Sequence, residues 1–182
     1  NSPGLIRTRV GACLDDIVTA ETATLENARV VSGSILDGRV STPPLNYLGR
    51  YANQVAVLEE GTHREFLGWQ KPGFEKHTVT RVYGGAWLKE KLFPMTTSQG
   101  GSKRAMVPIG TYEKVMPLDL LPTQLLRSMI FGVKTGETEE AERLGVLELA
   151  EEDVALCTYV CPGKYDYAGI LRANLETIEK EG

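Results

Sequence analysis

Two cysteines near the end of the chain stand in a run that closes with proline, Leu156-Cys157-Thr158-Tyr159-Val160-Cys161-Pro162. The run matches the second half of the motif C-x2-C-x2-C-x3-C-P, in which thiolates hold an iron–sulfur cluster. The two earlier ligand positions of that motif fall on Glu151 and Val154. Because valine cannot ligate iron and one carboxylate cannot replace the missing thiolates, the run predicts the turn of such a motif without its metal.

The same turn occurs earlier in the chain. Val115-Met116-Pro117 precedes Leu125-Leu126-Arg127 by the same spacing at which Val160-Cys161-Pro162 precedes Ile170-Leu171-Arg172. The ligand positions of the earlier copy, none of them a thiolate, would be Met106, Ile109, Tyr112 and Met116. The two copies favour a duplicated helical segment with the ground plan of a two-cluster ferredoxin. The alternative is that short apolar helices after a proline turn recur by chance.

The residue pattern changes from strand-like to helical near Gly100, which predicts two domains, 1–100 and 101–182. In the first, β-branched and aromatic runs alternate with turn residues, a pattern typical of strands. These runs cover residues 5–10, 29–31, 34–36, 54–58, 64–69 and 77–83. Helical spacing predicts a helix around Cys13, Leu14, Ile17 and Val18, and a second short one over 86–93. A hairpin is predicted over 59–62, with Gly61 at positive φ.

The second domain has the pattern of short helices joined by proline turns. Pro122 suits the first turn of a helix that Gly132 would end, and Glu137 opens another that Gly145 closes. A third helix is predicted over 151–159. The last has an apolar face formed by Tyr167, Ile170, Leu171, Leu175 and Ile178. Together the two halves predict an α+β protein, with a strand-rich, β-grasp-like half before a compact helical half.

Several unusual strings resemble the C-terminal part of the A subunit of the Na+-translocating NADH:quinone reductases, the bacterial sodium pumps. The resemblance runs from about Leu5 to the end. The strings are residues 31–34 (VSGS), 47–51 (YLGRY), 104–113 (RAMVPIGTYE), 115–119 (VMPLD) and 161–165 (CPGKY). A related protein that binds iron–sulfur clusters is the C subunit of the Rnf complex, which has both sets of four cysteine ligands. This sequence departs from that quartet pattern at six of its eight ligand positions.

The resemblance implies a soluble ligand-binding β-grasp domain followed by a ferredoxin-like domain without clusters. It further implies a peripheral subunit on the cytoplasmic face of the bacterial inner membrane, in a membrane complex with oxidoreductase and translocase activity. That complex passes electrons from NADH through flavins to a quinone, ubiquinone in this class, and exports Na+. The expected partners are the other subunits, with quinone as a candidate ligand. We expect the fragment itself to be noncatalytic, to bind no cofactor and to support assembly.

Charge and hydropathy exclude other classes of function. With 20 basic and 24 acidic residues the net charge is −4, which argues against electrostatic binding to nucleic acid or to an anionic membrane surface. No apolar stretch reaches the roughly 20 uninterrupted residues that a transmembrane helix needs. The N-terminus has no pattern of a signal peptide. The three cysteines fit a reducing cytoplasm better than a disulfide framework.

The residue types needed for catalysis or metal binding are scarce. The two histidines, His63 and His77, both lie in the strand-rich half and are expected to be solvated or at the edge of the core. Cys157 and Cys161 are expected to be buried packing residues rather than a redox pair, and Cys13 a small core residue. A zinc site would need a second close pair of ligands, which the sequence does not offer. We therefore predict no catalytic, cofactor-binding or metal-binding residue.

The loop after the second proline turn is a candidate subunit contact. It presents Lys164, Tyr165 and Tyr167, residue types that suit interfaces, although simple entry into a helix would use the same residues. The acidic run 137–153 is either a solvated face or a docking surface for a basic partner. Two rivals to a role within a complex stay open, namely a free-standing ligand-binding β-grasp module and a working iron–sulfur carrier.

Overall fold

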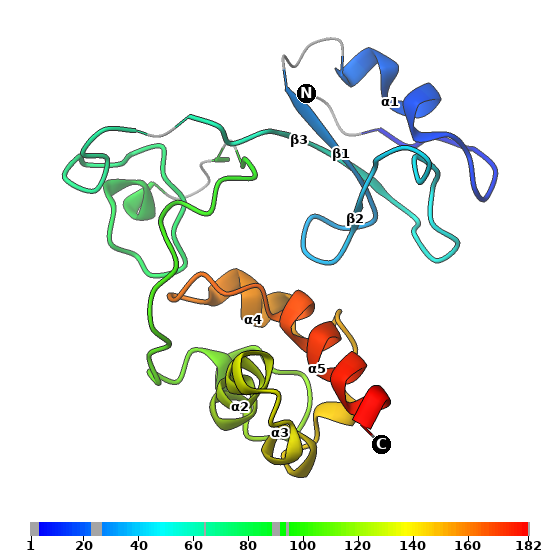
Figure 1. The fold of residues 1–182 in the computed structure, drawn as a ribbon. Helices are drawn as coiled ribbons and strands as arrows, with labels where there is room; N and C mark the ends of the chain where they lie inside the picture. Colours follow the sequence, from blue (N-terminus) through cyan, green and yellow to red (C-terminus); the bar gives the residue numbers. More distant parts are fainter. Residues whose placement is uncertain (1–3, 23–26, 64, 89–91, 94, 182) are drawn as a thin grey trace. The chain divides into compact units, whose positions relative to one another are not determined.

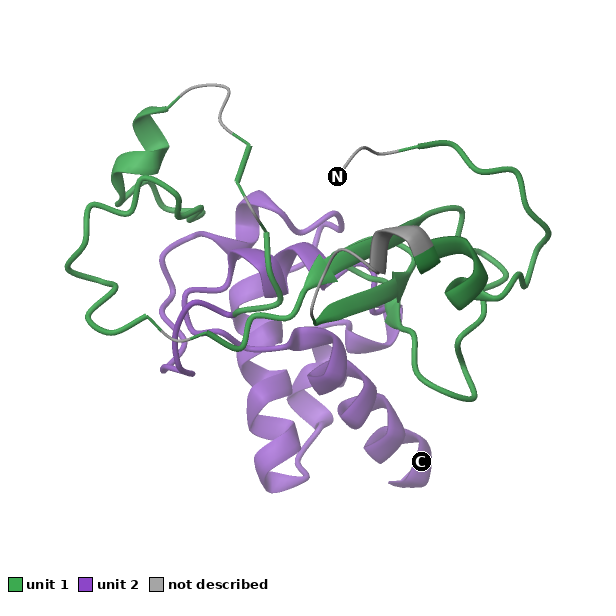
Figure 2. Cartoon of the chain, turned by 90° about the horizontal axis from the view of Figure 1, so that it is seen from above, with its two compact units in different colours: residues 1–98 green, residues 99–182 purple. Residues whose placement is uncertain are grey.

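The chain divides into two compact units, residues 1–98 and 99–182 (Figures 1 and 2). The computed structural model describes residues 4–22, 27–63, 65–88, 92–93 and 95–181. The division lies close to Gly100, where the sequence changes its texture. Each unit is built differently, because unit 1 contains the strands and unit 2 is helical.

Unit 1 is organised around a small antiparallel sheet and one helix. Its elements are α1 (Leu14–Thr22), β1 (Ala28–Ser32), β2 (Arg39–Val40), β3 (Val55–Glu59) and the 3-10 turn η1 (Gly84–Trp87). The strand order is β2-β1-β3, with Val31 opposite both Val40 and Ala56. Helix α1 contacts β1 and β3. Among the described residues of unit 1 the buried hydrophobic side chains are Leu14, Val18 and Val31, so helix and sheet share one small core.

The first domain has fewer strands than its sequence predicts. The predictions for 29–31, for 54–58 and for the helix around Leu14 are confirmed by β1, β3 and α1. Residues 5–10, 34–36 and 77–83 and the described residues 65–69 form no strand, and turns lie at 35–37 and 66–70 instead. Strand propensity depends on having a partner surface, and these runs have none within the described unit, as the full exposure of Leu5 illustrates.

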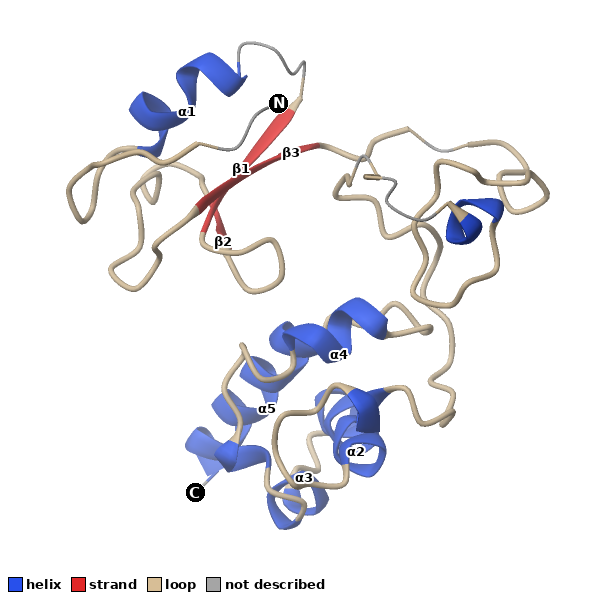
Figure 3. Cartoon of the chain, turned by 180° about the vertical axis from the view of Figure 1, so that it is seen from behind, coloured by secondary structure: helices blue, strands red, loops and turns tan. Residues whose placement is uncertain are grey.

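The described residues of the segment 61–98 are mostly loop (Figure 3). Its described residues contain η1 in place of the predicted helix over 86–93, part of which lies outside the described residues. The expected hairpin at 59–62 is wrong, since Gly61 does not have positive φ. Instead the N–H of Gly61 donates to Thr97 Oγ1 at 2.9 Å, and Glu59 forms a parallel bridge with Thr96. A Cβ on Gly61 would collide with Ser98, so the glycine permits a close approach of two backbones.

Unit 2 is a bundle of helices joined by turns. Its elements are η2 (Tyr112–Lys114), α2 (Pro122–Thr135), α3 (Glu139–Arg143), η3 (Val146–Glu148), α4 (Ala155–Val160) and α5 (Tyr167–Glu181). Helix α5 contacts α2 and α4, and α2 also contacts α3. The core contains twelve buried residues, including Leu125, Leu126, Met129 and Leu171. The predicted apolar stripes of α2 and α5 therefore face each other.

Helix α2 ends one turn later than predicted. Gly132 lies inside it, and the helix continues to Thr135. Gly136 takes the left-handed conformation at φ 79° and donates its N–H to the Gly132 carbonyl at 2.8 Å. The predictions of Pro122 in the first turn and of Gly145 after α3 are confirmed. Helix α4 begins at Ala155, because residues 151–154 form a turn.

Replacing Gly136 with alanine should lower the free energy of unfolding by about 1 kcal/mol, because a Cβ is disfavoured in the left-handed conformation. No atom lies within 4 Å of the position that the Cβ would occupy, so the effect would be purely conformational. Urea unfolding followed by circular dichroism measures it. Gly101→Ala is the matched control, because Gly101 lies in the same unit without positive φ. Equal effects of the two substitutions would contradict this account.

Among the described residues, none of the helices combines the length and the apolar character required to cross a bilayer.

Candidate functional site

The second proline turn links α4 to α5 and carries the cysteine that ends the sequence motif. Cys161 follows α4 in an extended conformation, and the backbone then reverses through Pro162 and Gly163. Lys164 has a φ of 62°, an uncommon conformation for a residue with a side chain. The N–H of Tyr165 points back to Cys161 Sγ at 3.5 Å. The turn is also tied to the start of unit 2, since Arg104 N–H donates to the Gly163 carbonyl at 3.0 Å.

Three buried side chains form a closed hydrogen-bonded ring beside this turn. Tyr167 Oη donates to Tyr112 Oη at 3.0 Å, and Tyr112 Oη lies 3.2 Å from Cys161 Sγ. Cys161 Sγ in turn donates to Tyr167 Oη at 3.7 Å. Tyr112 and Tyr167 have no exposed surface and Cys161 only 2%. If Tyr112 donates to the sulfur, each group gives one hydrogen bond within the ring and receives one within it, which offsets the cost of burying them.

The environment of the ring holds its hydroxyl groups in the neutral form. The rings of Tyr112 and Tyr167 meet edge to face, with centroids 5.7 Å apart. Burial, as the main cause, raises the pKa of both hydroxyls well above the usual value. Burial also raises the pKa of the neighbouring Cys157 thiol to about 11. Neutral, buried thiols are poor nucleophiles, so Cys157 is suited to packing rather than to thiol chemistry.

Several ligand positions of the two sequence copies are occupied by packed side chains or lie at the surface. In the second copy Val154 and Cys157 are fully buried in the core, while Glu151 is at the rim and pairs with Arg172. In the first copy Ile109 is 60% exposed. Some of the eight positions are thus filled by packed side chains, and others face solvent.

The two copies nevertheless share an order of elements. In each, a short helical turn, η2 or α4, precedes the proline, and a longer helix, α2 or α5, follows it. Leu126 and Leu171 occupy equivalent places and are both fully buried. In two-cluster ferredoxins the fourth cysteine of one run ligates the cluster of the other run. The contact between Tyr112, a third position, and Cys161, a fourth position of the other copy, has this crossed pairing.

A second polar group lies in the interface between α2 and α5. Asn174 is 1% exposed, and its Nδ2 donates to the carbonyls of Met129 at 2.9 Å and Ile170 at 2.8 Å. Its Oδ1 has no hydrogen-bond partner among the described residues and faces Gly132, where a Cβ would collide with it. Gly132 therefore allows the two helices to approach closely around a polar side chain.

The residues predicted as a subunit contact separate into two groups. Lys164 and Tyr165 are half-buried and reach solvent, whereas Tyr167 is fully buried and belongs to the core. The expectation that Cys157 and Cys161 are buried is confirmed. Cys13 is only half-buried, with its Sγ 3.8 Å from Asn46 Nδ2, because it precedes α1 at the rim of the small core.

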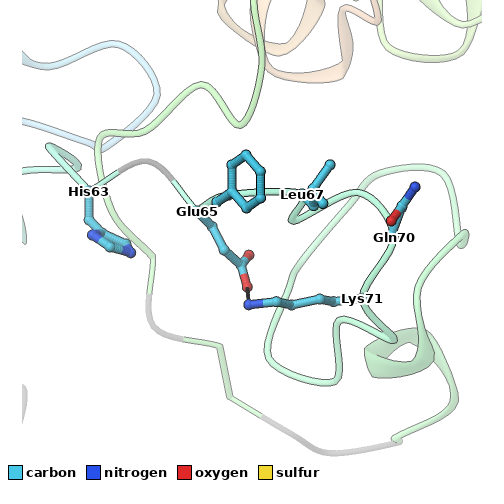
Figure 4. A pocket seen from close by; sticks show the side chains of 6 residues that line it. His63, Glu65, Leu67, Gln70 and Lys71 are labelled. Atoms are coloured by element: carbon cyan, nitrogen blue, oxygen red, sulfur yellow. Dashed lines mark ion pairs between the residues drawn. The ribbon is translucent and has the colours of Figure 1, made fainter.

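Unit 1 has an open hollow of about 640 Å³ in the segment 61–98 (Figure 4). It is lined by His63, Glu65, Phe66, Leu67, Gln70 and Lys71. Glu65 pairs with Lys71 at 2.7 Å and with Lys76, and hydrogen bonds from these two lysines lower the pKa of Glu65 to about 2. His77 does not line this hollow and packs on Phe93 with ring centroids 5.6 Å apart. Within the described ranges, no group of three or more His, Cys, Asp and Glu side chains is placed to hold a metal ion.

Comparison with known proteins finds similarity to A subunits of Na+-translocating NADH-quinone reductases. A family model described as "NQRA C-terminal domain" matches residues 1–42. The chain is 58% identical over its whole length to the A subunit of the Na+-translocating NADH-quinone reductase of Rhodopirellula baltica, of which it covers 39%. It is 54% identical over 99% of its length to the corresponding protein of Psychromonas ingrahamii, again covering 39% of that protein. With the corresponding protein of Neisseria meningitidis it shares 53% identity over all its residues and 40% of the relative.

The chain belongs to this A-subunit family. It spans about two fifths of the length of the curated relatives that it matches. The sequence strings that suggest this family lie in both units, at residues 31–34 and 161–165 among others. The buried ring and the small sheet are therefore features of a region that these relatives share with high identity.

The sequence alone does not reveal the full roles of three residues at this site. The sequence pattern makes Tyr112 only an unsuitable ligand position. It places Tyr167 both on the apolar face of α5 and in the contact loop, but it does not reveal that the two tyrosines together satisfy Cys161. Asn174 stands within the apolar face of α5, between Leu171 and Leu175. A polar residue at a core position of an amphipathic helix is a signal that could have revealed it.

High pH should destabilise unit 2 of the A-subunit chain through Cys157. The unfolded thiol ionises near its ordinary pKa of about 8.5, but the folded one only near 11. Between these values the unfolded state binds fewer protons, so the free energy of unfolding falls as the pH rises, by at most about 1.4 kcal/mol per pH unit for this group. The contribution is fully present below about pH 8.5.

Urea unfolding at several pH values between about 8 and 9.5 tests this, since tyrosine hydroxyls in the unfolded state still keep most of their protons there. Cys157→Ala should give a flatter pH dependence than the native chain, whatever its absolute stability. Parallel pH profiles for the two proteins would show that Cys157 is not the group responsible.

Proposed function

We propose that this chain is part of a peripheral subunit of a Na+-translocating NADH:quinone reductase and supports assembly of that complex, without a redox centre of its own. The names of the A-subunit relatives support membership in this complex. The high identity over the whole chain supports assigning the same role to it. In this proposal NADH and flavin chemistry belong to other subunits. The chain would lie on the cytoplasmic face of the bacterial inner membrane, and quinone interaction is proposed for the subunit without assigned residues.

The observation that carries the noncatalytic role is the filled ligand positions of unit 2. An iron–sulfur cluster needs four thiolates or similar ligands around one centre. Here Val154 fills a ligand position with a fully buried apolar side chain, and Glu151 turns to Arg172. The residues do not fit a cluster, so no electron-transfer step is assigned to them. The ring of Tyr112, Cys161 and Tyr167 supports a structural role instead.

The fold assignments belong to the same proposal. A single helix packed on a small antiparallel sheet supports a β-grasp-like unit 1. The repeated order of helical turn, proline and helix, together with the crossed Tyr112–Cys161 contact, supports a ferredoxin-like unit 2 that has lost its clusters. Both assignments predict that a solved structure of an A-subunit relative would superimpose on these units one by one.

Gel filtration of this chain, co-expressed with the other subunits of the Rhodopirellula baltica reductase, tests the proposal. We expect the chain to co-elute with them. A chain that elutes alone would favour the free-standing ligand-binding module. Iron and sulfide analysis after anaerobic purification provides the second readout, and stoichiometric amounts of both would mean that unit 2 is a working iron–sulfur carrier.

Lys164 and Tyr165 are proposed as part of the subunit contact, while Tyr167 is assigned to the core. If the lysine lies at the centre of the interface, reversing its charge with Lys164→Glu should lower the affinity for the other subunits about tenfold, equivalent to about 1.4 kcal/mol. The amount of chain that co-elutes should fall accordingly. Lys103→Glu makes the same charge change at an exposed position of the same unit and should have no effect. Equal behaviour of the two variants would remove this loop from the contact.

A further inference from the structure

The segment 61–98 has almost no core of its own. In its described part the buried residues are two glycines, Gly68 and Gly85. By contrast, Phe66 is 84% exposed, and the only tryptophans of the chain, Trp69 and Trp87, are 70% and 84% exposed. Large aromatic side chains dominate the energetics of cores and interfaces, so their exposure together in one segment is unusual for a unit that stands alone.

Other apolar side chains extend this exposed surface. They include Leu67, Phe74, Val79, Val82 and Leu88. Phe66 and Leu67 line the hollow of about 640 Å³, which gives the surface a concave part (Figure 4). Tyr83 and Phe74 approach the backbone at Gly73 and Gly84, so the segment has local packing of its own. We call the exposed side chains of residues 66–88 the aromatic surface.

We propose that the aromatic surface is the docking surface for the part of the A-subunit polypeptide that lies outside the region shared with this chain. The relatives are about two and a half times as long as this chain, which covers 39–40% of them. A covalently linked partner is present at millimolar effective concentration or above. It can therefore cover this surface before any separate molecule does.

The nature of the backbone favours a protein occupant over a lipid one. The described part of 61–98 is loop except for η1 and the bridge at Thr96, and its chain is not an amphipathic helix. Loop N–H and carbonyl groups cannot be satisfied in hydrocarbon, whereas a protein surface offers donors and acceptors for them. The inference depends on the family match and not on the role in complex assembly, so either can fail alone.

The first experiment measures the tryptophan emission of the purified 182-residue chain. Both tryptophans lie in the aromatic surface, so the signal reports this surface alone. We expect an emission maximum close to that of tryptophan in water. Emission typical of buried tryptophan would mean that the chain covers the surface by itself, which would overturn the proposal.

The second experiment co-expresses the tagged chain with the part of the Rhodopirellula baltica A subunit that lies outside the region matched by this chain. It measures how much of that part is recovered with the tagged chain. We expect stoichiometric recovery, reduced at least tenfold by Phe66→Ala, Trp69→Ala or Trp87→Ala. Tyr51→Ala is the matched control, because Tyr51 is 94% exposed in the same unit but outside the segment, and it should leave recovery unchanged. Hydroxyl-radical footprinting with mass spectrometry should show Phe66, Trp69 and Trp87 protected in the complex.

Several results would overturn the proposal. They are failure of the native pair to co-purify, equal recovery with the aromatic variants, and an unchanged footprint. Tryptophan-dependent self-association of the chain would instead identify a second copy as the occupant. Tryptophan-dependent binding to vesicles containing anionic phospholipid would identify a membrane surface.

Discussion

Tyr167→Ala is expected to lower the free energy of unfolding of unit 2 by about 3–5 kcal/mol, the range for large aromatic side chains removed from a core. Tyr167 has no exposed surface, packs edge to face on Tyr112 and closes the hydrogen-bonded ring with Cys161. The substitution would remove the packing and would also take one hydrogen bond each from Tyr112 Oη and Cys161 Sγ, which would keep only their contact with each other in the ring. Urea unfolding followed by far-ultraviolet circular dichroism measures the effect, since most of the helix lies in unit 2.

Tyr167→Phe distinguishes the contribution of the hydrogen bonds from that of the packing. It keeps the aromatic side chain and removes only the hydroxyl, so the expected loss is about 1–3 kcal/mol, the net contribution of the two hydrogen bonds to Tyr112 and Cys161 that disappear. Tyr165→Phe is the control, because Tyr165 is half-buried at the rim, and its loss should be within about 0.5 kcal/mol. In a double-mutant cycle Tyr167→Phe and Tyr112→Phe should be less than additive. Additive losses would mean that the three groups do not act as a ring.

Gly132→Ala is expected to destabilise unit 2 by about 1–3 kcal/mol through overpacking, although alanine is the better helix former. A Cβ at Gly132 would collide with Asn174 Oδ1 and lie 3.3 Å from the Glu137 carbonyl oxygen. The helices α2 and α5 would have to separate, which would weaken the hydrogen bond from Asn174 to the Met129 carbonyl. The same unfolding measurement gives the size of the effect.

A matched substitution distinguishes this collision from a general effect of alanine. Gly169 lies in α5 and is exposed, so Gly169→Ala should be neutral or stabilise by up to about 1 kcal/mol. Adding Asn174→Ala to Gly132→Ala should recover part of the loss, because it removes the atom in the way. Without such recovery, the close approach at Gly132 would not depend on Asn174.

The helices of unit 2 could be predicted from the sequence because their signals are local. Pro122 and Gly145 mark helix ends through the conformations they allow, and the apolar period of α5 repeats over the length of the helix. The end of α2 could not be placed because two glycines stand near it. Gly132 is required by a neighbouring helix and Gly136 by the left-handed turn, and the local pattern does not distinguish these reasons.

The strands of unit 1 could be predicted only in part. Residues 29–31 and 54–58 pair with each other, whereas the similar runs at 5–10 and 77–83 have no strand partner in the described unit. A β-branched run is suited to a sheet, but pairing requires a second strand and a surface to cover. This difference lies outside the run itself.

The amino-acid order alone determined which segments of unit 2 become helices and to which family the chain belongs. These properties depend on local spacing and on strings of residues. Only the tertiary structure decided that Tyr112 meets Cys161 across 49 positions and Tyr167 across 55, and that Asn174 lies against Gly132. Such contacts depend on how helices pack, and packing is set by the combined shape of many side chains rather than by any one segment.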